Sequence, residues 1–263
     1  MAFNPNELIL EKIRSVEEYD PSTNELIGRY TQIEDPSLKT SADAQEVTDA
    51  MGATIYTIYN AQKGTFDFNN SLFSLDLAAS QYGSKKIVAT DTNKITVPVS
   101  EVIDIASDHT VTLKYTPVGT TGAEVKYVKV INADNTFGET YEVSATAGDK
   151  KFTINGKVIT MPEDVTGRVF VNYDKESGEA VQVTKRTDGV PEVKTLLIHA
   201  IFHAVCDTNT VYAGIIRCPR AQIDPSSTEI SLKPDGKHAA SYILQKDYCS
   251  SDAKLFDIIV SKD

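Results

Sequence analysis

The chain has 263 residues and a mass of 28.8 kDa, enough for one large β domain or for a domain that carries an insert. Its 37 acidic residues outnumber 26 basic ones, and the net charge of −11 disfavours a phosphate-gripping surface, which needs clustered Lys and Arg. Three cysteines without CxxC spacing argue against a disulfide scaffold or a zinc knuckle and favour folding in a reducing cytoplasm.

The first block predicts a long hairpin. Two apolar stretches flank "DPSTN" (20–24), whose residues favour turns, and a short helix over residues 7–16 is the alternative. The polar passage "DPSLKTSADAQEVTDAMG" (35–52) then resembles a loop. After it, β-branched and aromatic residues in "ATIYTIYN" (53–60) and "KGTFDF" (63–68) predict strands.

A helix of about three turns is predicted over residues 71–82. Asn70 or Ser71 can cap it, and Gly83, followed by two lysines, supplies a stop. Its apolar residues recur at helical spacing: Leu72, Leu75, Ala78 and Ala79.

From residue 88 onward the pattern predicts one short strand after another, separated by turn signals. The clearest turn is Asn155-Gly156, which favours a two-residue hairpin loop. Residues 98–175 contain enough strands for a small Ig-like β-sandwich. We therefore expect this module to be inserted into a discontinuous β domain made of residues 1–97 and 176–263.

The last part of the chain adds more strands. Two are predicted around "DTNT" (207–210), and three more come from residues 221–248, which contain an Asp235-Gly236 turn, and from "AKLFDIIVSK" (253–262). Before that turn, Ile230 and Leu232 form one face of a strand. The predicted fold class is thus mainly β, with one flanking helix.

A cysteine and histidine cluster is the strongest candidate for chemistry. On a strand, His199 and His203 share a face and Cys206 points to the other. If the loop places Cys206 opposite Val211, Cys218 falls opposite His199, and such a pair can act as nucleophile and base. No third orienting group is indicated, so the preferred interpretation is that these are half-buried sheet residues.

Other chemistry is not indicated. The acidic residues are scattered and match a calcium loop only in part, "GTTGAE" lacks the dinucleotide spacing, and Walker A, GxSxG and HExxH motifs are absent. Short basic runs without interleaved aromatics do not predict a nucleic-acid platform. We expect neither enzyme activity nor a cofactor or metal, and neither a Sec signal nor a membrane span.

Several strands near the C-terminus are apolar on both faces. Phe256, Ile258 and Val260 alternate with Leu255, Asp257 and Ile259, and Tyr242 and Leu244 alternate with residues that include Ile243. Strands of this kind must be covered on both faces, either by the rest of the chain or by a neighbouring copy. The pattern favours a self-assembling β protein.

Two regions resemble one known family. "ELIGRYTQIEDPSLKTSADAQEVTDAMG", the strand pair "IYTIYNAQKGTFDF" and the helix "NSLFSLDLAASQYGS" are similar to the N-terminal half of tail tube proteins of long-tailed bacteriophages. The closing segment from "YAGIIRCPRAQIDP" to "KLFDIIV" resembles their C-terminal half. The resemblance covers roughly residues 1–90 and 165–263. It lies in the order of the elements and in short stretches of similar sequence.

The resemblance implies a β-sandwich flanked by a helix, six copies of which form a ring around a continuous β-barrel. Stacked rings would form the virion tail tube through which DNA is ejected, after synthesis in the bacterial host cytoplasm. Sheath, tail-terminator and baseplate proteins are the implied partners, and a negative lumen would repel DNA. The expected subunit contacts are Pro36, Leu38, Lys39, Tyr242, Leu244, Phe256 and Ile258.

Two other functions stay open. The strands of residues 98–175 are compatible with a capsid decoration or an adhesin-type binding module on the virion surface. A cysteine-dependent enzyme centred on Cys218 and His199 is the third hypothesis.

Overall fold

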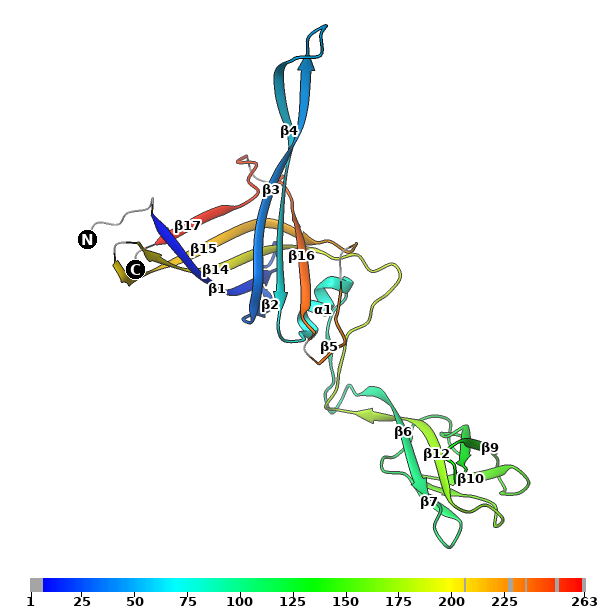
Figure 1. Ribbon diagram of the computed structural model, residues 1–263. Coiled ribbons are helices and arrows are strands. Elements are labelled where there is room, and N and C mark those ends of the chain that lie inside the picture. Colours follow the sequence, from blue (N-terminus) through cyan, green and yellow to red (C-terminus); the bar gives the residue numbers. More distant parts are fainter. Residues whose placement is uncertain (1–6, 206, 227–228, 235, 249–250, 262–263) are drawn as a thin grey trace. The chain divides into compact units, whose positions relative to one another are not determined.

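The computed structural model describes residues 7–205, 207–226, 229–234, 236–248 and 251–261 (Figure 1). It divides the chain into two compact units. We call Met1–Lys86 with Val183–Asp263 the host unit, and Ile87–Gln182 the inserted unit. The module expected at residues 98–175 lies within the inserted unit.

The host unit is built on an eight-stranded sheet. Seven of its strands follow the order β2-β1-β14-β15-β16-β4-β3, and the eighth, β17, pairs with β15. All of these pairings are antiparallel. Its elements are β1 (Leu8–Tyr19), β2 (Leu26–Tyr30), β3 (Ile33–Thr48), β4 (Thr54–Asn70), α1 (Leu75–Tyr82), β14 (Val193–Ala204), β15 (Asp207–Ile223), β16 (His238–Leu244) and β17 (Asp257–Ser261).

The N-terminal hairpin is confirmed, because β1 and β2 pair in antiparallel fashion. The loop expected at residues 35–52 is wrong, since most of it belongs to the long strand β3. The two strands expected at 53–60 and 63–68 are one continuous strand, β4. Side chains of β3 beyond Ser41 are largely exposed on both faces, so the alternation that signals a strand is missing there.

The predicted helix is confirmed, although it begins later than expected. Its N-cap is Ser74, whose hydroxyl accepts a hydrogen bond from the backbone N–H of Leu77 (3.2 Å). Gly83 ends the helix in the left-handed region (φ 60°), as its position indicated. In the part of the chain that the structure describes, no helix is long and apolar enough to cross a membrane.

The core of the host unit lies between the sheet and α1. The ring of Phe68 of β4 contacts the rings of Phe66, of Tyr30 of β2 and of Tyr242 of β16. The buried cluster consists of Val16, Tyr30, Phe66, Phe68, Leu77, Leu196, Ile198, Cys218, Ala221, Ile223, Ala240, Tyr242 and Leu244. Burial of this much apolar surface stabilises the unit.

The inserted unit has its own core and a seven-stranded sheet with the order β6-β12-β8-β9-β10-β11-β7. Those strands are β6 (Ile95–Asp104), β7 (Thr110–Thr112), β8 (Tyr127–Ile131), β9 (Phe137–Val143), β10 (Lys151–Asn155), β11 (Val158–Thr160) and β12 (Arg168–Ser177). A short pair, β5 (Ile87–Val88) and β13 (Val181–Gln182), lies where the chain enters and leaves the unit.

The hairpin expected near Asn155-Gly156 forms between β10 and β11, with its loop one residue further along. Asn155 pairs with Val158, so Gly156 and Lys157 form the loop, and Gly156 takes the positive φ (59°). A glycine at the first loop position is the type II′ arrangement.

One C-terminal strand was wrongly predicted. The segment with Ile230 and Leu232 forms only an isolated bridge, between Ile230 and His238, and Leu232 is 93% exposed. Alternation alone over five residues does not bury a face when no neighbouring strand packs against it. The turn residue Asp235 lies outside the described residues.

Candidate functional site

Part of the host sheet extends past the core as a four-stranded region that we call the wing. It consists of residues 8–13 of β1, 199–204 of β14, 210–216 of β15 and 257–261 of β17. Figure 1 shows these strands running beyond the part of the sheet that packs near α1.

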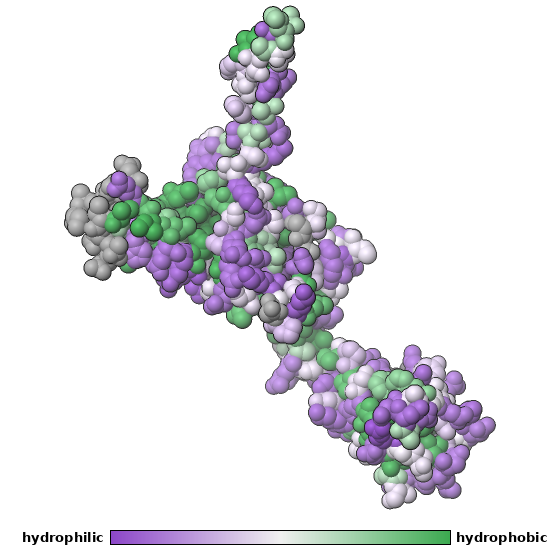
Figure 2. All heavy atoms as spheres, viewed as in Figure 1, coloured by the Kyte–Doolittle hydropathy of each residue, from purple (hydrophilic) through white to green (hydrophobic). Residues whose placement is uncertain are grey.

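One face of the wing, the core face, continues the surface that packs in the core. In the core, Val16 pairs with Ile198, and in the wing, Leu10 pairs with Phe202. Ile198 and Phe202 are four residues apart on one strand, so the two pairs lie on the same side of the sheet. Leu10 is 51% exposed and Ile258 58% exposed, and Figure 2 shows hydrophobic side chains gathered over this region. Its residues are Leu8, Leu10, Ile13, Ala200, Phe202, Ala204, Tyr212, Ile258 and Val260.

Both margins of the wing lack a neighbouring strand among the described residues. β2 pairs with β1 only at Val16–Tyr19, which leaves the outer edge of residues 8–13 open. At the other margin β17 pairs with β15 and with no further strand of the described chain. Open edges next to an uncovered apolar face are the features that monomeric proteins avoid.

The opposite face of the wing, the open face, contains two histidine-carboxylate pairs. His199 Nε2 lies 3.2 Å from Glu17 Oε2, and His203 Nε2 lies 2.6 Å from Glu11 Oε2. Burial raises the pKa of Glu17, but hydrogen bonds with Tyr19 and His199 outweigh it and lower the pKa. The hydrogen bond with His203, followed by that with Lys12, lowers the pKa of Glu11.

The proposed Cys218 and His199 pair does not form. Cys218 pairs with Leu196 and lies in the core, whereas His199 pairs with Ile215 and lies on the open face. The expected register was wrong because the hairpin pairs His203 with Val211, three residues from the assumed match, and Cys206 lies outside the described residues. Burial raises the pKa of Cys218 to about 12, so its reactive thiolate is disfavoured.

A second exposed feature is the hairpin tip formed by residues 41–60 of β3 and β4, which we call the finger. It projects from the sheet in Figure 1. Val47, Tyr56 and Ile58 share one side and are exposed. The finger contains Asp43, Glu46 and Asp49 and no basic residue, although Lys63 at its base pairs with Asp43 at 2.9 Å.

The expected contact residues have different surroundings. Pro36 and Lys39 are exposed on β3, with Lys39 Nζ 3.1 Å from Asp67, while Leu38 packs partly on the core. Tyr242 and Leu244 are buried in the core of their own chain.

The two C-terminal candidates lie closer to the wing. Phe256 packs partly on the core, and Ile258 is an exposed wing residue. Sequence reasoning missed the β1 side of the wing. The signal for β1 was its apolar start, "LIL", next to a predicted strand.

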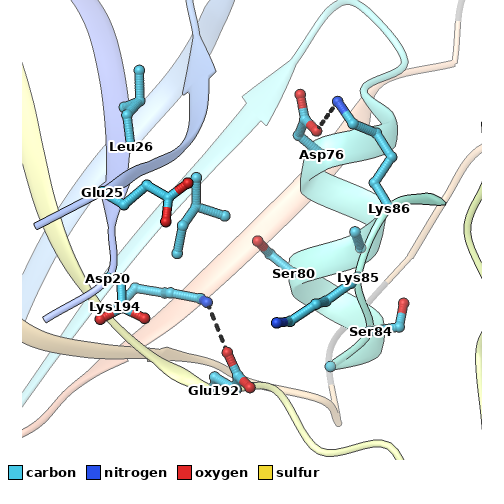
Figure 3. Close-up of a pocket in the computed structure, with 13 residues that line it drawn as sticks. Asp20, Glu25, Leu26, Asp76, Ser80, Ser84, Lys85, Lys86, Glu192 and Lys194 are labelled. Atoms are coloured by element: carbon cyan, nitrogen blue, oxygen red, sulfur yellow. Dashed lines mark hydrogen bonds and ion pairs between the residues drawn. The ribbon is translucent and has the colours of Figure 1, made fainter. Parts of the chain in front are cut away.

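A pocket of about 660 Å³ lies between α1 and β14 (Figure 3). Two ion pairs lie in its lining, Lys194 with Glu192 at 3.1 Å and Lys86 with Asp76, and Asp20, Glu25 and Lys85 line it as well. Among the described residues no group of three metal-ligating side chains occurs. The wing and the finger are the candidate functional surfaces.

Comparison with protein families gives one match. The model of the YomU/Tube protein family matches residues 8–253, nearly the whole chain. No curated protein matches the chain.

Proposed function

The chain belongs to the YomU/Tube protein family, and from this premise we propose that it is the tail tube subunit of a long-tailed bacteriophage. In this proposal six copies form a ring, and stacked rings form the virion tail tube that conducts DNA during ejection. The observation that carries the proposal is the wing, whose apolar core face and two open edges are complete only when further copies cover them.

Strand directions support closure into a ring. The wing order β1-β14-β15-β17 is antiparallel throughout, so β1 and β17 run in opposite directions. Under rotational symmetry, β17 of one copy can therefore pair with β1 of the next in an antiparallel junction, repeated around the ring. Each copy would contribute four strands to the barrel, which leaves no open edge.

The finger supplies a second contact in this proposal. A hairpin that is exposed on both faces and has an apolar side of Val47, Tyr56 and Ile58 is suited to a groove on another subunit. We assign it to contacts between stacked rings, with Pro36, Leu38 and Lys39 at its base.

Surface binding by the inserted unit is the second candidate function. Tyr127 and Phe137 are exposed there, and Lys129 lies over the Phe137 ring at 5.7 Å. An exposed aromatic group of this kind is typical of recognition surfaces. This role would add a decoration or adhesin activity to the tube and does not replace assembly.

The test compares assembly of two matched variants. Ile258→Asp places a charge on the wing core face, and Val102→Asp places one on a strand of the inserted unit with similar exposure, 58% against 54%. We expect rings and tubes of wild type and Val102→Asp by negative-stain microscopy and sedimentation, and only monomers of Ile258→Asp. A wild-type chain that stays monomeric at millimolar concentration, or tubes of Ile258→Asp, would contradict the proposal.

A further inference from the structure

The two sides of the host sheet differ in what packs against them. Along β14, buried and half-buried residues alternate strictly: Lys194, Leu196, Ile198 and Ala200 are buried on the core face, and Thr195, Leu197, His199 and Ile201 are half-buried on the open face. Leu77 of α1, Phe66 of β4 and Tyr242 of β16 all pack on the core face. The bulk of the host unit therefore lies on one side of the wing.

This asymmetry decides which face can point toward the axis of a ring. Space is smallest next to the axis, so α1, β4 and β16 fit only on the outside of a barrel built from the wing. Resting on the proposed function, we infer that the open face lines the channel and is the surface that a passing nucleic acid meets.

The open face is suited to a polyanion that must slide without binding. Two of its cations are held by carboxylates: Lys12 Nζ is 3.4 Å from Glu11, and Arg29 Nε is 3.0 Å from Glu17. The same two carboxylates are the partners of His203 and His199, and Arg217 lies across the sheet from Asp257. A phosphate would have to displace a carboxylate to reach Lys12 or Arg29.

Charge balance, more than excess negative charge, characterises this surface. With neutral imidazoles, Lys12 and Arg29 compensate Glu11 and Glu17, and aliphatic side chains lie between them on neighbouring strands. These are Ile9, Ile201, Ile215 and Ile259. In this inference the lining is close to neutral and partly apolar, so that DNA meets neither strong attraction nor strong repulsion there.

Cysteine labelling of assembled tubes tests which face lines the channel. In a Cys206→Ser/Cys249→Ser background, Ala213→Cys marks the open face of the wing and Thr140→Cys marks the inserted unit as the control; both positions are exposed in the single chain. We expect a small maleimide to label both in tubes. A maleimide on a long polyethylene glycol chain should label Ala213→Cys at least an order of magnitude more slowly than Thr140→Cys, and dissociated subunits should show no difference.

The outcomes separate this inference from the proposed function. If no tubes form, the proposed function is refuted and the inference with it. If tubes form and the long reagent labels both positions equally, or the small reagent fails at Ala213→Cys, the inference alone is refuted.

A second arm tests the charge balance with short duplex DNA as the probe. Glu11→Gln/Glu17→Gln leaves Lys12 and Arg29 without their carboxylates, whereas Glu139→Gln/Glu142→Gln removes the same charge from the inserted unit. We expect DNA to cosediment with tubes of the first variant only. Equal cosedimentation with wild-type tubes would overturn the inference.

Discussion

The carboxyl group of Glu18 is the least expected single feature of the chain. The pair Glu17-Glu18 reads as two solvated acids, yet Glu18 is fully buried on the core side of β1. Ser80 of α1 donates a hydrogen bond to it at 2.6 Å, and the Tyr242 hydroxyl donates another. The sequence contains no sign of this contact, because the donors follow Glu18 by 62 and 224 residues.

The effect of a Glu18 substitution on the unfolding free energy should depend on pH. Burial raises the pKa of Glu18 above its ordinary 4.5, so the folded unit binds this proton more tightly than the unfolded chain does. Its contribution to stability is full at pH below 4.5 and is lost as pH rises toward the folded-state pKa. We therefore expect the unfolding free energy of Glu18→Gln, relative to wild type, to increase between pH 5 and pH 8 in urea titrations.

Two controls accompany this measurement. Glu25 is exposed in the turn before β2, so the unfolding free energy of Glu25→Gln should equal that of wild type at pH 5 and at pH 8. Glu18→Ala should lose about 1–3 kcal/mol because the hydroxyls of Ser80 and Tyr242 are left without their acceptor. Parallel pH profiles of Glu18→Gln and wild type would contradict the assignment.

At the scale of elements, the helix and strands that were predicted correctly are those whose formation depends on residues close in sequence. The helix stop at Gly83 and the strands of the inserted unit follow from capping and alternation, which nearby residues determine. The strand β3 did not follow, because a hairpin exposed on both faces has no apolar period. The register of β14 and β15 also failed, since two bulges in their pairing are invisible in the sequence.

Removal of the finger should separate folding from assembly. Replacing residues 43–60 by an Asn-Gly turn deletes none of the core residues, so the unfolding free energy should change by less than about 1 kcal/mol. We expect single rings that do not lengthen into tubes in negative-stain images. Thr57→Ser, a mild change on the other side of the finger, should form tubes of normal length.

The opposite result would have a clear meaning. Tubes of normal length from the shortened chain would show that ring stacking uses another surface. A chain that fails to fold would show that β3 and β4 need their distal pairing for stability.

At the scale of the whole molecule, the wing could be anticipated only in part. Two-faced strands predicted that copies must cover the sheet, and Ile258, one of the expected contacts, is exposed in the single chain. Tyr242 showed the same local alternation but is covered by β4 and Glu18 of its own chain. Which apolar residues remain uncovered depends on long-range packing, so the sequence indicates self-assembly more reliably than it identifies the contacts.

Deletion of the inserted unit should leave tube formation intact. Ile87 of β5 is paired with Gln182 of β13, so their Cα atoms lie about 5 Å apart and a short Gly-Ser link can replace everything between them. We expect the chain lacking residues 87–182 to form tubes by electron microscopy with a reduced mass per ring. Loss of assembly in a shortened chain that remains folded would assign the inserted unit a role in ring contacts.

The adjacency of Ile87 and Gln182 also bears on how such a gene can change. A coding segment that begins and ends at neighbouring points in space can be gained, lost or exchanged by recombination without altering the path of the rest of the chain. Selection can then act on the inserted unit, while the host unit evolves under separate constraints.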